Sequence, residues 1–386
     1  MLHGDGWDRD LTPENAHLIP SPFDHFSRSP GFPLVAIVAD DLTGALDSTA
    51  PFAKAGLTTC VAVEPSRLRA AIATGVQVVA VSTGSRAMEP QSAAAAVADA
   101  AQAFARVPVI IAFKKIDSRL KGHVAVEVEA ALDGFRRATA IVCPAIPDLG
   151  RTVSDGLVRG RGAEAGLSVA GSLGPILERC RIPDVGDERD VGLVADDLLA
   201  APDAILAVGA RGLADALARK LTARLGMGER PDLPFHLPRP VVIGIGSRDP
   251  ITLAQVDRLR DRLGPLLFDA PGGEWGPHPH ADGADVVGFV MSEGRARISP
   301  GVAAERFAHQ ITGDIRHRRP RSLVLSGGDI AAAVMAKLGI GLLRVVGEIL
   351  PGLPLCRALD DQQDVTIVTK SGGFGGPDTL LQVLET

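Results

Sequence analysis

Short apolar runs alternate with amphipathic or Ala-rich stretches along residues 34–144. The apolar runs predict strands, and the stretches between them predict helices. Alternation at this spacing is typical of βαβ units, so we expect a parallel sheet. The predicted strands cover residues 34–39, 57–63, 76–82, 109–113 and 138–143.

A second series of the same kind follows a break. Residues 145–190 are rich in Gly, Pro and Arg and predict a connecting or lid region with one short helix at 173–181. A strand at 204–208 and a helix at 213–225 come next, before prolines at 231, 234, 238 and 240 that are typical of an interdomain linker. The later predicted strands are 241–245, 285–291, 322–325, 342–346 and 365–369, and the helices are 252–263, 303–316 and 330–338.

This pattern predicts an α/β protein of two domains, each with a mostly parallel sheet flanked by helices. We expect the first domain at residues 31–235 and the second at 236–386. Residues 1–30 are polar and proline-containing and predict a loosely ordered extension.

The apolar run 35–39 stops at two adjacent carboxylates, Asp40 and Asp41, and the chain then turns through Thr43 and Gly44. This predicts a buried strand that delivers polar groups to the carboxyl edge of a sheet, where ligands of open α/β sheets bind. The alternative is that Asp41 or Thr43 caps a helix that starts near Gly44. Capping accounts for one polar residue but not for two carboxylates.

A second pair of carboxylates, Asp196 and Asp197, follows a similar apolar run without the Thr-Gly turn. We interpret this pair as a helix start only. A phosphatase with a D-x-D-x-T motif is another candidate for Asp40 and Asp41. The two are adjacent, however, and neighbouring side chains of an extended backbone point in different directions, which argues against it.

The loop at 114–123 combines cations, a carboxylate and a turn glycine directly after a predicted strand. Such a loop suits an anionic substrate, because Lys and Arg bind carboxylate or phosphate through charge-assisted hydrogen bonds. The alternative is a solvated basic loop. The next loop, 144–152, contains two prolines that stiffen the approach to Arg151. Taken alone, it is weak evidence for a binding site.

Three loops of the second domain are rich in glycine. Residues 244–247 follow a strand, but Asp249 stands where a dinucleotide fingerprint needs its third glycine, and nothing fits G-x-x-x-x-G-K-[ST]. Residues 326–329 and 370–376 also follow strands, and they leave backbone N–H groups available to phosphate. Lys370 is placed to lie against a phosphate oxygen. Each loop alone is compatible with an ordinary turn, but three in one domain favour a nucleotide.

Composition narrows the function classes. Of 386 residues, 40 are basic and 46 acidic, a formal net charge of −6, and the basic cluster 316–321 predicts a solvated loop, so we expect no nucleic-acid role. The four cysteines form no C-x-x-C pair, which predicts neither zinc nor disulfides and fits a reducing cytoplasm. No apolar stretch approaches the ~20 residues that cross a bilayer, and the N-terminus does not resemble a signal peptide. We expect a cytoplasmic protein without a membrane role, and a homodimer is left open.

With these loops in order, the chain resembles the four-carbon acid sugar kinase family from residue 35 to the end. The motifs that carry the resemblance are residues 39–47, 115–118, 150–152, 246–247 with Thr252 and Gln255, 326–329 and 370–375.

The resemblance implies an N-terminal domain that binds a four-carbon sugar acid and a C-terminal domain that binds ATP with Mg²⁺. The terminal hydroxyl is phosphorylated in the cleft between them, and known members act on D-threonate, D-erythronate or 3-oxo-tetronate. Asp40 and Asp41 would hold substrate hydroxyls, and either Asp41 or Asp117 would accept the proton. Arg119, Lys121 and Arg151 would face the carboxylate of the acid.

The implied ATP-binding residues are Ser247, Gly327, Gly328, Asp329, Lys370, Gly372 and Gly373, and no residue is assigned as a metal ligand.

The chain departs from the family at a few positions. Members usually read Lys-Ile-Asp-Ser-Thr-Leu-Arg-Gly-Asn in the basic loop, where this chain has Arg119, Lys121 and His123. A lysine cannot make the forked contact of an arginine, so the identity of the acid is open. Ile330 replaces a common threonine. Two rivals therefore remain: a sugar-acid-binding or regulatory protein without phosphoryl transfer, and a metal-dependent sugar-phosphate phosphatase.

Overall fold

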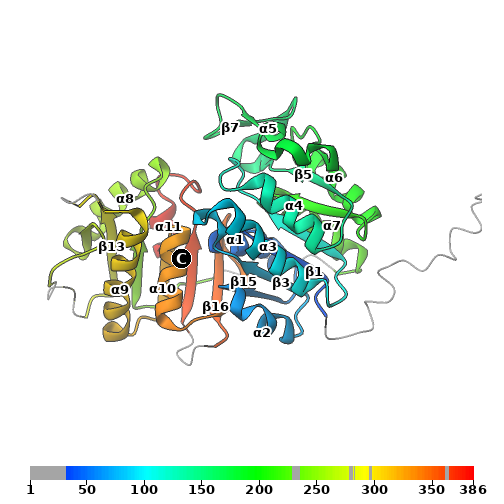
Figure 1. The fold of residues 1–386 in the computed structure, drawn as a ribbon. Coiled ribbons are helices and arrows are strands. Elements are labelled where there is room, and N and C mark those ends of the chain that lie inside the picture. The colour runs from blue at the N-terminus through cyan, green and yellow to red at the C-terminus, as the bar shows by residue number, and fades with distance from the viewer. Residues whose placement is uncertain (1–31, 228–234, 278–280, 282, 295–297, 361–364) are drawn as a thin grey trace, which may run out of the picture.

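A computed structural model describes residues 32–227, 235–277, 281, 283–294, 298–360 and 365–386. The predicted extension at 1–30 and much of the predicted linker lie outside the described residues. Two lobes stand side by side, as the colour change from blue and green to yellow and red shows (Figure 1).

The N-terminal lobe is built on parallel strands in the order β2-β3-β1-β4-β10-β5, with the two-residue β9 at the edge. Helices cover both faces of this sheet, so the strands are buried and read as continuous apolar runs. The strands are β1 (Val35–Ala39), β2 (Thr59–Ala62), β3 (Val78–Ser82), β4 (Ile111–Lys115), β5 (Thr139–Cys143), β9 (Cys180–Arg181) and β10 (Ile205–Gly209). The main helices are α1 (Leu42–Lys54), α2 (Leu68–Ala73), α3 (Pro90–Phe104), α4 (Val124–Gly134), α6 (Glu188–Ala200) and α7 (Arg211–Arg224).

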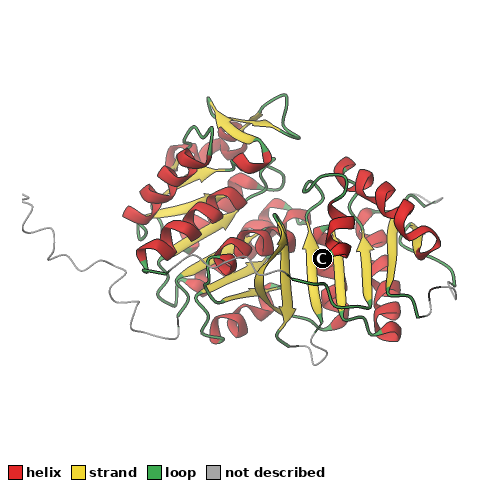
Figure 2. Ribbon diagram, turned by 180° about the vertical axis from the view of Figure 1, so that it is seen from behind, coloured by secondary structure: helices red, strands yellow, loops and turns green. Residues whose placement is uncertain are grey.

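The C-terminal lobe repeats this design with parallel strands in the order β12-β13-β11-β14-β17, followed by an antiparallel pair, β16 and β15. These strands are β11 (Val241–Ile245), β12 (Leu267–Pro271), β13 (Val286–Ser292), β14 (Ser322–Ser326), β15 (Leu342–Leu350), β16 (Leu353–Ala358) and β17 (Thr366–Lys370). The helices are α8 (Pro250–Leu263), α9 (Pro300–Arg318), α10 (Gly328–Leu338) and α11 (Thr379–Glu385). Figure 2 shows the strands from behind with helices along their flanks.

The two lobes share one sheet. Strand β15 pairs with β2 in antiparallel fashion, which joins both series into a single sheet of 14 strands. The hydroxyl of Thr59 donates to the carbonyl of Val345 at 2.7 Å beside this junction. The predicted fold class is confirmed, with the addition that the two predicted sheets are continuous. The domain boundary near residue 235 stays a prediction.

The structure corrects four local predictions. The region predicted as a lid with little order contains a small antiparallel sheet of β6 (Arg151–Ser154), β7 (Leu157–Gly160) and β8 (Leu167–Ser168), at the top of Figure 1. Its strands are too short to leave a periodic pattern. The helix predicted at 173–181 is instead the end of α5 (Val169–Leu173) followed by a 3₁₀ turn (Gly174–Arg179).

The prediction that Asp196 and Asp197 start a helix is wrong, because both residues lie inside α6. The N-cap of α6 is Asp187, whose side chain accepts hydrogen bonds from the first turn. The basic cluster at 316–321 is also only partly a loop, because Arg316 to Arg318 form the last turn of α9. Basic side chains are favourable at that end of a helix dipole. Among the described helices, none has the length and apolar character to cross a membrane.

Candidate active site

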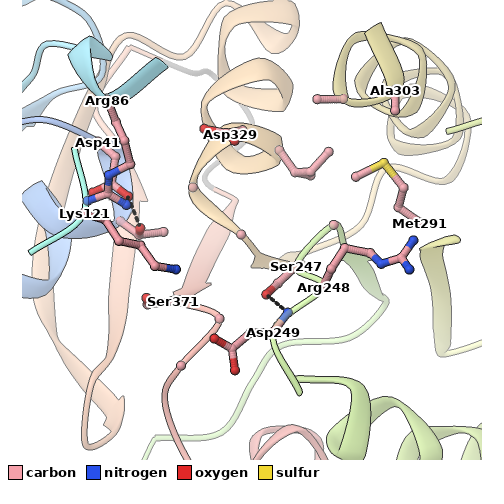
Figure 3. Close-up of a pocket in the computed structure, with 18 of the residues that line it drawn as sticks. Asp41, Arg86, Lys121, Ser247, Arg248, Asp249, Met291, Ala303, Asp329 and Ser371 are labelled. Carbon is pink, nitrogen blue, oxygen red and sulfur yellow. Dashed lines mark hydrogen bonds and ion pairs between the residues drawn. The ribbon is translucent and has the colours of Figure 1, made fainter. Parts of the chain in front are cut away.

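Five of the loops singled out in the sequence, those that contain Asp41, Asp117, Ser247, Gly328 and Gly372, meet in one pocket of about 1100 Å³ between the lobes. No residue of the loop at 144–152 is among the described residues that line it. The carboxyl ends of parallel strands in each lobe face this pocket, which is why loops far apart in the sequence come together there. Figure 3 shows Asp41, Arg86 and Lys121 on one side and Ser247, Asp249 and Met291 across from them. The lining residues include Asp41, Thr43, Arg86, Asp117, Arg119, Lys121, Ser247, Asp249, Gly327, Gly328, Asp329, Ile330, Gly372 and Gly373.

Asp40 and Asp41 converge on one guanidinium. Arg86 donates through Nε and Nη2 to the carboxylate of Asp40, at 2.7 and 3.0 Å, and through Nη1 to Oδ2 of Asp41, at 2.6 Å. The expectation that the two side chains point in different directions is wrong, because β1 ends at Ala39 and the backbone bends before α1 begins.

The two carboxyl groups differ in their ionisation. Burial alone would raise the pKa of Asp40, but the positive charges of Arg86, Lys114 and Lys115 outweigh burial and lower it. Burial raises the pKa of Asp41, and the charge of Asp40 adds to this effect while Arg86 opposes it. Neighbouring carboxyl groups whose pKa values are shifted in opposite directions can take different roles. Here Asp40 is anionic and Asp41 is the readier proton acceptor.

Asp41 also caps α1. Its Oδ1 accepts from the backbone N–H of Gly44 at 2.8 Å, and its Oδ2 accepts from the hydroxyl of Thr43 at 3.0 Å. Asp41 therefore both caps α1 and lines the pocket, and its contact with a substrate stays a prediction.

The start of α10 lies directly against Asp41. A β carbon added at Gly328 would stand 3.0 Å from Oδ2 of Asp41 and 3.1 Å from the hydroxyl oxygen of Thr43. The preceding Gly327 has φ of 109°, a conformation that favours glycine. The first residue of α10 thus lies close to Asp41 and Thr43 of the other lobe, where a larger side chain at 328 would collide with them.

The basic loop after β4 is mostly covered, so the solvated-loop alternative is wrong for its first half. Lys114 is fully buried and forms an ion pair with Glu127 at 2.8 Å. Asp117 lines the pocket, where its Oδ1 accepts from the backbone N–H of Arg119 at 2.8 Å. Lys121 is exposed at the mouth of the pocket.

Arg151 lies behind the pocket instead of lining it. Its side chain is buried, with Nε donating to the carbonyl of Arg161 and Nη1 to the hydroxyl of Ser118, both at 2.8 Å. Burial and the nearby charge of Arg119 lower its pKa. Its Nη2 has no hydrogen-bond partner among the described residues and lies 3.7 Å from the place of a β carbon on Gly373. A direct contact of Arg151 with the acid stays a prediction.

The three glycine-rich loops pack on one another. A β carbon on Gly372 would stand only 2.3 Å from the hydroxyl oxygen of Ser247, so the close approach requires glycine. Asp249 caps α8 by accepting from the N–H of Ile251. Ile330 is buried under Gly246, where a β carbon would overlap its Cγ1 at 2.0 Å. The isoleucine found in place of a threonine therefore fills the space beneath this loop.

Lys370 is buried beneath the last loop and is not among the described residues that line the pocket. Its ammonium donates to the hydroxyl of Thr252 and to the carbonyl of Ser371, both at 2.9 Å. Burial lowers the pKa of Lys370 to about 8, although Asp249 opposes this. Gln255 supports the same loop through the carbonyls of Phe374 and Gly376. In this arrangement Lys370 shapes the loop and does not point at the position of a phosphate.

Sequence reasoning missed Arg86, which joins the two carboxylates. Its signal was present, because residues 83–86 also follow an apolar strand and contain Gly, Ser and Arg. Asp249 was noted only as a missing glycine, yet it accepts from Arg119 of the other lobe at 3.0 Å.

Comparison with known proteins decides the family. Residues 35–168 match the family described as the sugar-binding N-terminal domain, and residues 282–380 match the nucleotide-binding C-terminal domain. The chain belongs to the four-carbon acid sugar kinase family. The first matched range contains Asp41, Asp117 and Arg119, and the second contains Gly328 and Gly372, so the two matched domains supply residues to both sides of the pocket.

Curated relatives align along most of their length. A D-threonate kinase of Salmonella typhimurium is 28% identical, and the alignment covers 90% of this chain and 97% of the kinase. A D-threonate kinase of Bordetella bronchiseptica is 27% identical, with 92% and 98% covered, and a 3-oxo-tetronate kinase of Methylobacterium radiotolerans is 27% identical, with 90% and 98% covered.

Solved structures share the fold. A protein of Salmonella typhimurium LT2 superposes with a TM-score of 0.69 at 18% identity, covering 90% of this chain and 98% of the other. A protein of Haemophilus influenzae gives a TM-score of 0.62 at 18% identity, with 91% and 99% covered. At this identity the likeness concerns the fold alone.

Proposed function

We propose that the protein is an ATP-dependent kinase that phosphorylates the terminal hydroxyl of a four-carbon sugar acid. D-threonate is the first candidate, because D-threonate kinases align with this chain over about nine-tenths of its length. D-erythronate and 3-oxo-tetronate are the next candidates.

One contact carries the proposal: the N-terminus of α10 meets Asp41 across the boundary of the lobes. A helix N-terminus after a glycine-rich turn is a favourable phosphate site. Phosphoryl transfer mainly requires that donor and acceptor be positioned in line and that charge be neutralised. A phosphate at Gly327 and Gly328 would lie beside the carboxylate that receives the acceptor hydroxyl, which is the geometry a kinase needs.

Two carboxylates remain candidates for the general base. Burial raises the pKa of Asp41, which makes its carboxylate a stronger proton acceptor, but both of its oxygens already accept hydrogen bonds. Asp117 also lines the pocket, and its Oδ2 is only loosely paired, at 3.9 Å from Nη2 of Arg86. We assign substrate positioning to Asp40 through Arg86, and proton acceptance to Asp41 or Asp117.

Arg119 and Lys121 supply positive charge at the mouth of the pocket, where the carboxylate of the acid would lie. Magnesium fits this site as a companion of the nucleotide. The described residues hold no cluster of three or more potential metal ligands. A Mg²⁺ bound to ATP phosphates needs water and only one or two protein carboxylates. Asp329 and Asp249, which line the pocket, can provide these carboxylates.

All four cysteines are free thiols, which supports action in a reducing compartment such as the cytoplasm.

The decisive experiment is ADP release by purified protein with ATP and Mg²⁺. The panel is D-threonate, D-erythronate, L-threonate and 3-oxo-tetronate, with five- and six-carbon acids as controls. We expect turnover on one four-carbon acid, with a product phosphorylated at the terminal carbon. Binding of an acid without ADP release would favour a non-catalytic sugar-acid-binding protein. Phosphate release from a sugar phosphate without ATP would favour a phosphatase.

A further inference from the structure

A second cavity of about 20 Å³ adjoins the large pocket and is lined mostly by the N-terminal lobe, with Ser371 and Phe374 of the C-terminal lobe also in its wall. It shares Asp41, Thr43, Arg86 and Asp117 with the large pocket. Asp47 and Lys115 line this cavity but not the large pocket. This volume accommodates about one water-sized group. It can therefore hold one functional group of a ligand whose remainder lies in the large pocket.

Asp47 lines this cavity and carries an oxygen without a hydrogen-bond donor. It follows Gly44 by three residues on α1, so both lie on the same helix face. The side chain is buried, with 5% exposed, and its Oδ1 has no hydrogen-bond partner among the described residues. Arg211 is 3.8 Å away but makes closer contacts with Asp148, at 2.7 Å, and Glu348, at 3.3 Å. Asp47 is thus left with an acceptor that lacks a donor.

Lys115 presents the complementary group. It ends β4 with 5% exposed, and its ammonium forms no hydrogen bond or direct ion pair with a described residue. Its Nζ lies 2.9 Å from the place of a β carbon on Gly44, in space that only glycine leaves open. The charge of Lys115 acts on the carboxyl groups of Asp40, Asp41 and Asp47. A buried donor and a buried acceptor therefore line the same small cavity.

We propose that Asp47 and Lys115 form the inner end of the sugar-acid site and bind one secondary hydroxyl of the acid. The hydroxyl donates to Asp47 and accepts from Lys115. This inference rests on the proposed function and adds residues that select among four-carbon acids.

A hydroxyl suits this place better than the carboxylate of the acid. It is both donor and acceptor, so one group satisfies both side chains. A carboxylate would face the negative charge of Asp40 and, unlike a hydroxyl, has no proton to donate to the ionised form of Asp47. Because Asp47 and Lys115 line the same small cavity, a hydroxyl must reach both at once, and this requirement distinguishes the configuration at the bound carbon. Arg119 and Lys121 at the mouth of the pocket suit the carboxylate of the acid instead.

The test is calorimetric titration with the four-carbon acid that gives turnover, D-threonate first. Its analogues are 3,4-dihydroxybutanoate, which lacks the hydroxyl at carbon 2, and 2,4-dihydroxybutanoate, which lacks the one at carbon 3. The proteins are the wild type, Asp47→Ala, Lys115→Met and the control Asp148→Asn, which alters the same arginine cluster outside the cavity.

We expect the wild type to bind the full acid at least tenfold more tightly than one of the two analogues. Asp47→Ala and Lys115→Met should lose tenfold or more for the full acid yet bind that analogue within about twofold of the wild type. Asp148→Asn should keep the wild-type discrimination.

If Asp47→Ala and Lys115→Met weaken binding of the full acid and of both analogues by the same factor, the two residues have only a structural role and the inference is overturned. Affinities equal to those of the wild type would also overturn it. Variants that turn over the acid with wild-type discrimination would overturn the inference alone. Absence of any acid binding or turnover by the wild type would overturn the proposed function as well.

Discussion

Arg119 of the sugar-binding lobe donates a hydrogen bond to Asp249 of the nucleotide-binding lobe, with 3.0 Å between Nη2 and Oδ2. Burial would raise the pKa of Asp249, but the backbone N–H of Ile251 and the side chain of Arg119 outweigh it and lower the pKa. The carboxylate is thus anionic at neutral pH and holds one wall of the pocket to the other.

Removing this ion pair should reveal energetic coupling between the lobes. We expect Arg119→Ala and Asp249→Ala each to lower the free energy of unfolding by about 1–2 kcal/mol, and the double variant to lose about 1 kcal/mol less than the sum. Urea denaturation of the four proteins measures this. The pair Arg248 and Glu293, at 2.8 Å but largely exposed, is the control and should show coupling near zero. Strict additivity for Arg119 and Asp249 would contradict the prediction.

Asp41→Asn should lower kcat by roughly 10²–10⁴-fold if Asp41 is the base. The fold should be kept, because asparagine caps a helix about as well as aspartate. ADP release and thermal unfolding check the two parts of the prediction. Asp197→Asn, from the other Asp-Asp pair, is the matched control and should retain activity. Near-normal turnover by folded Asp41→Asn would transfer the role to Asp117.

Lys370→Ala should mainly impair use of ATP. The substitution leaves the carbonyl of Ser371 and the hydroxyl of Thr252 without their donor, so the loop at 371–373 loses its support. We expect the KM for ATP to rise about tenfold while the KM for the acid changes little, as measured by steady-state kinetics. Lys337→Ala, on α10 and paired with Glu305, serves as control. An unchanged ATP dependence would refute this role of Lys370.

Asp47 predicts a pH dependence of stability. Burial raises its pKa from the usual 3.8 to about 7. Between these values the folded state holds a proton that the unfolded state releases, so this group makes the free energy of unfolding fall as pH rises from about 4 to 7. The full effect is roughly 4 kcal/mol at 1.36 kcal/mol per pKa unit.

Asp47→Asn removes this slope. Relative to the wild type, the variant should therefore gain stability between pH 4 and 7 and keep a constant difference above pH 8. Urea denaturation at several pH values measures the difference. Parallel curves for Asp47→Asn would show that Asp47 has an ordinary pKa.

The amino-acid sequence by itself determined the strand and helix series and the edge at which the site forms. Apolar runs that end in polar or glycine-rich loops are local signals, and parallel strands bring their carboxyl ends together. That reasoning was enough to place Asp41, Asp117, Gly328 and Ser247 around one pocket.

Tertiary structure alone decided which side chains meet. Arg86 joins Asp40 to Asp41, Lys370 turns inward, and β2 pairs with β15 to merge the sheets. Each depends on contacts between segments far apart in the chain, and these arise from packing and strand register, which leave no periodic trace in the sequence. The direction of a side chain at the end of a strand depends on the neighbour that packs against it, and only the folded chain supplies that neighbour.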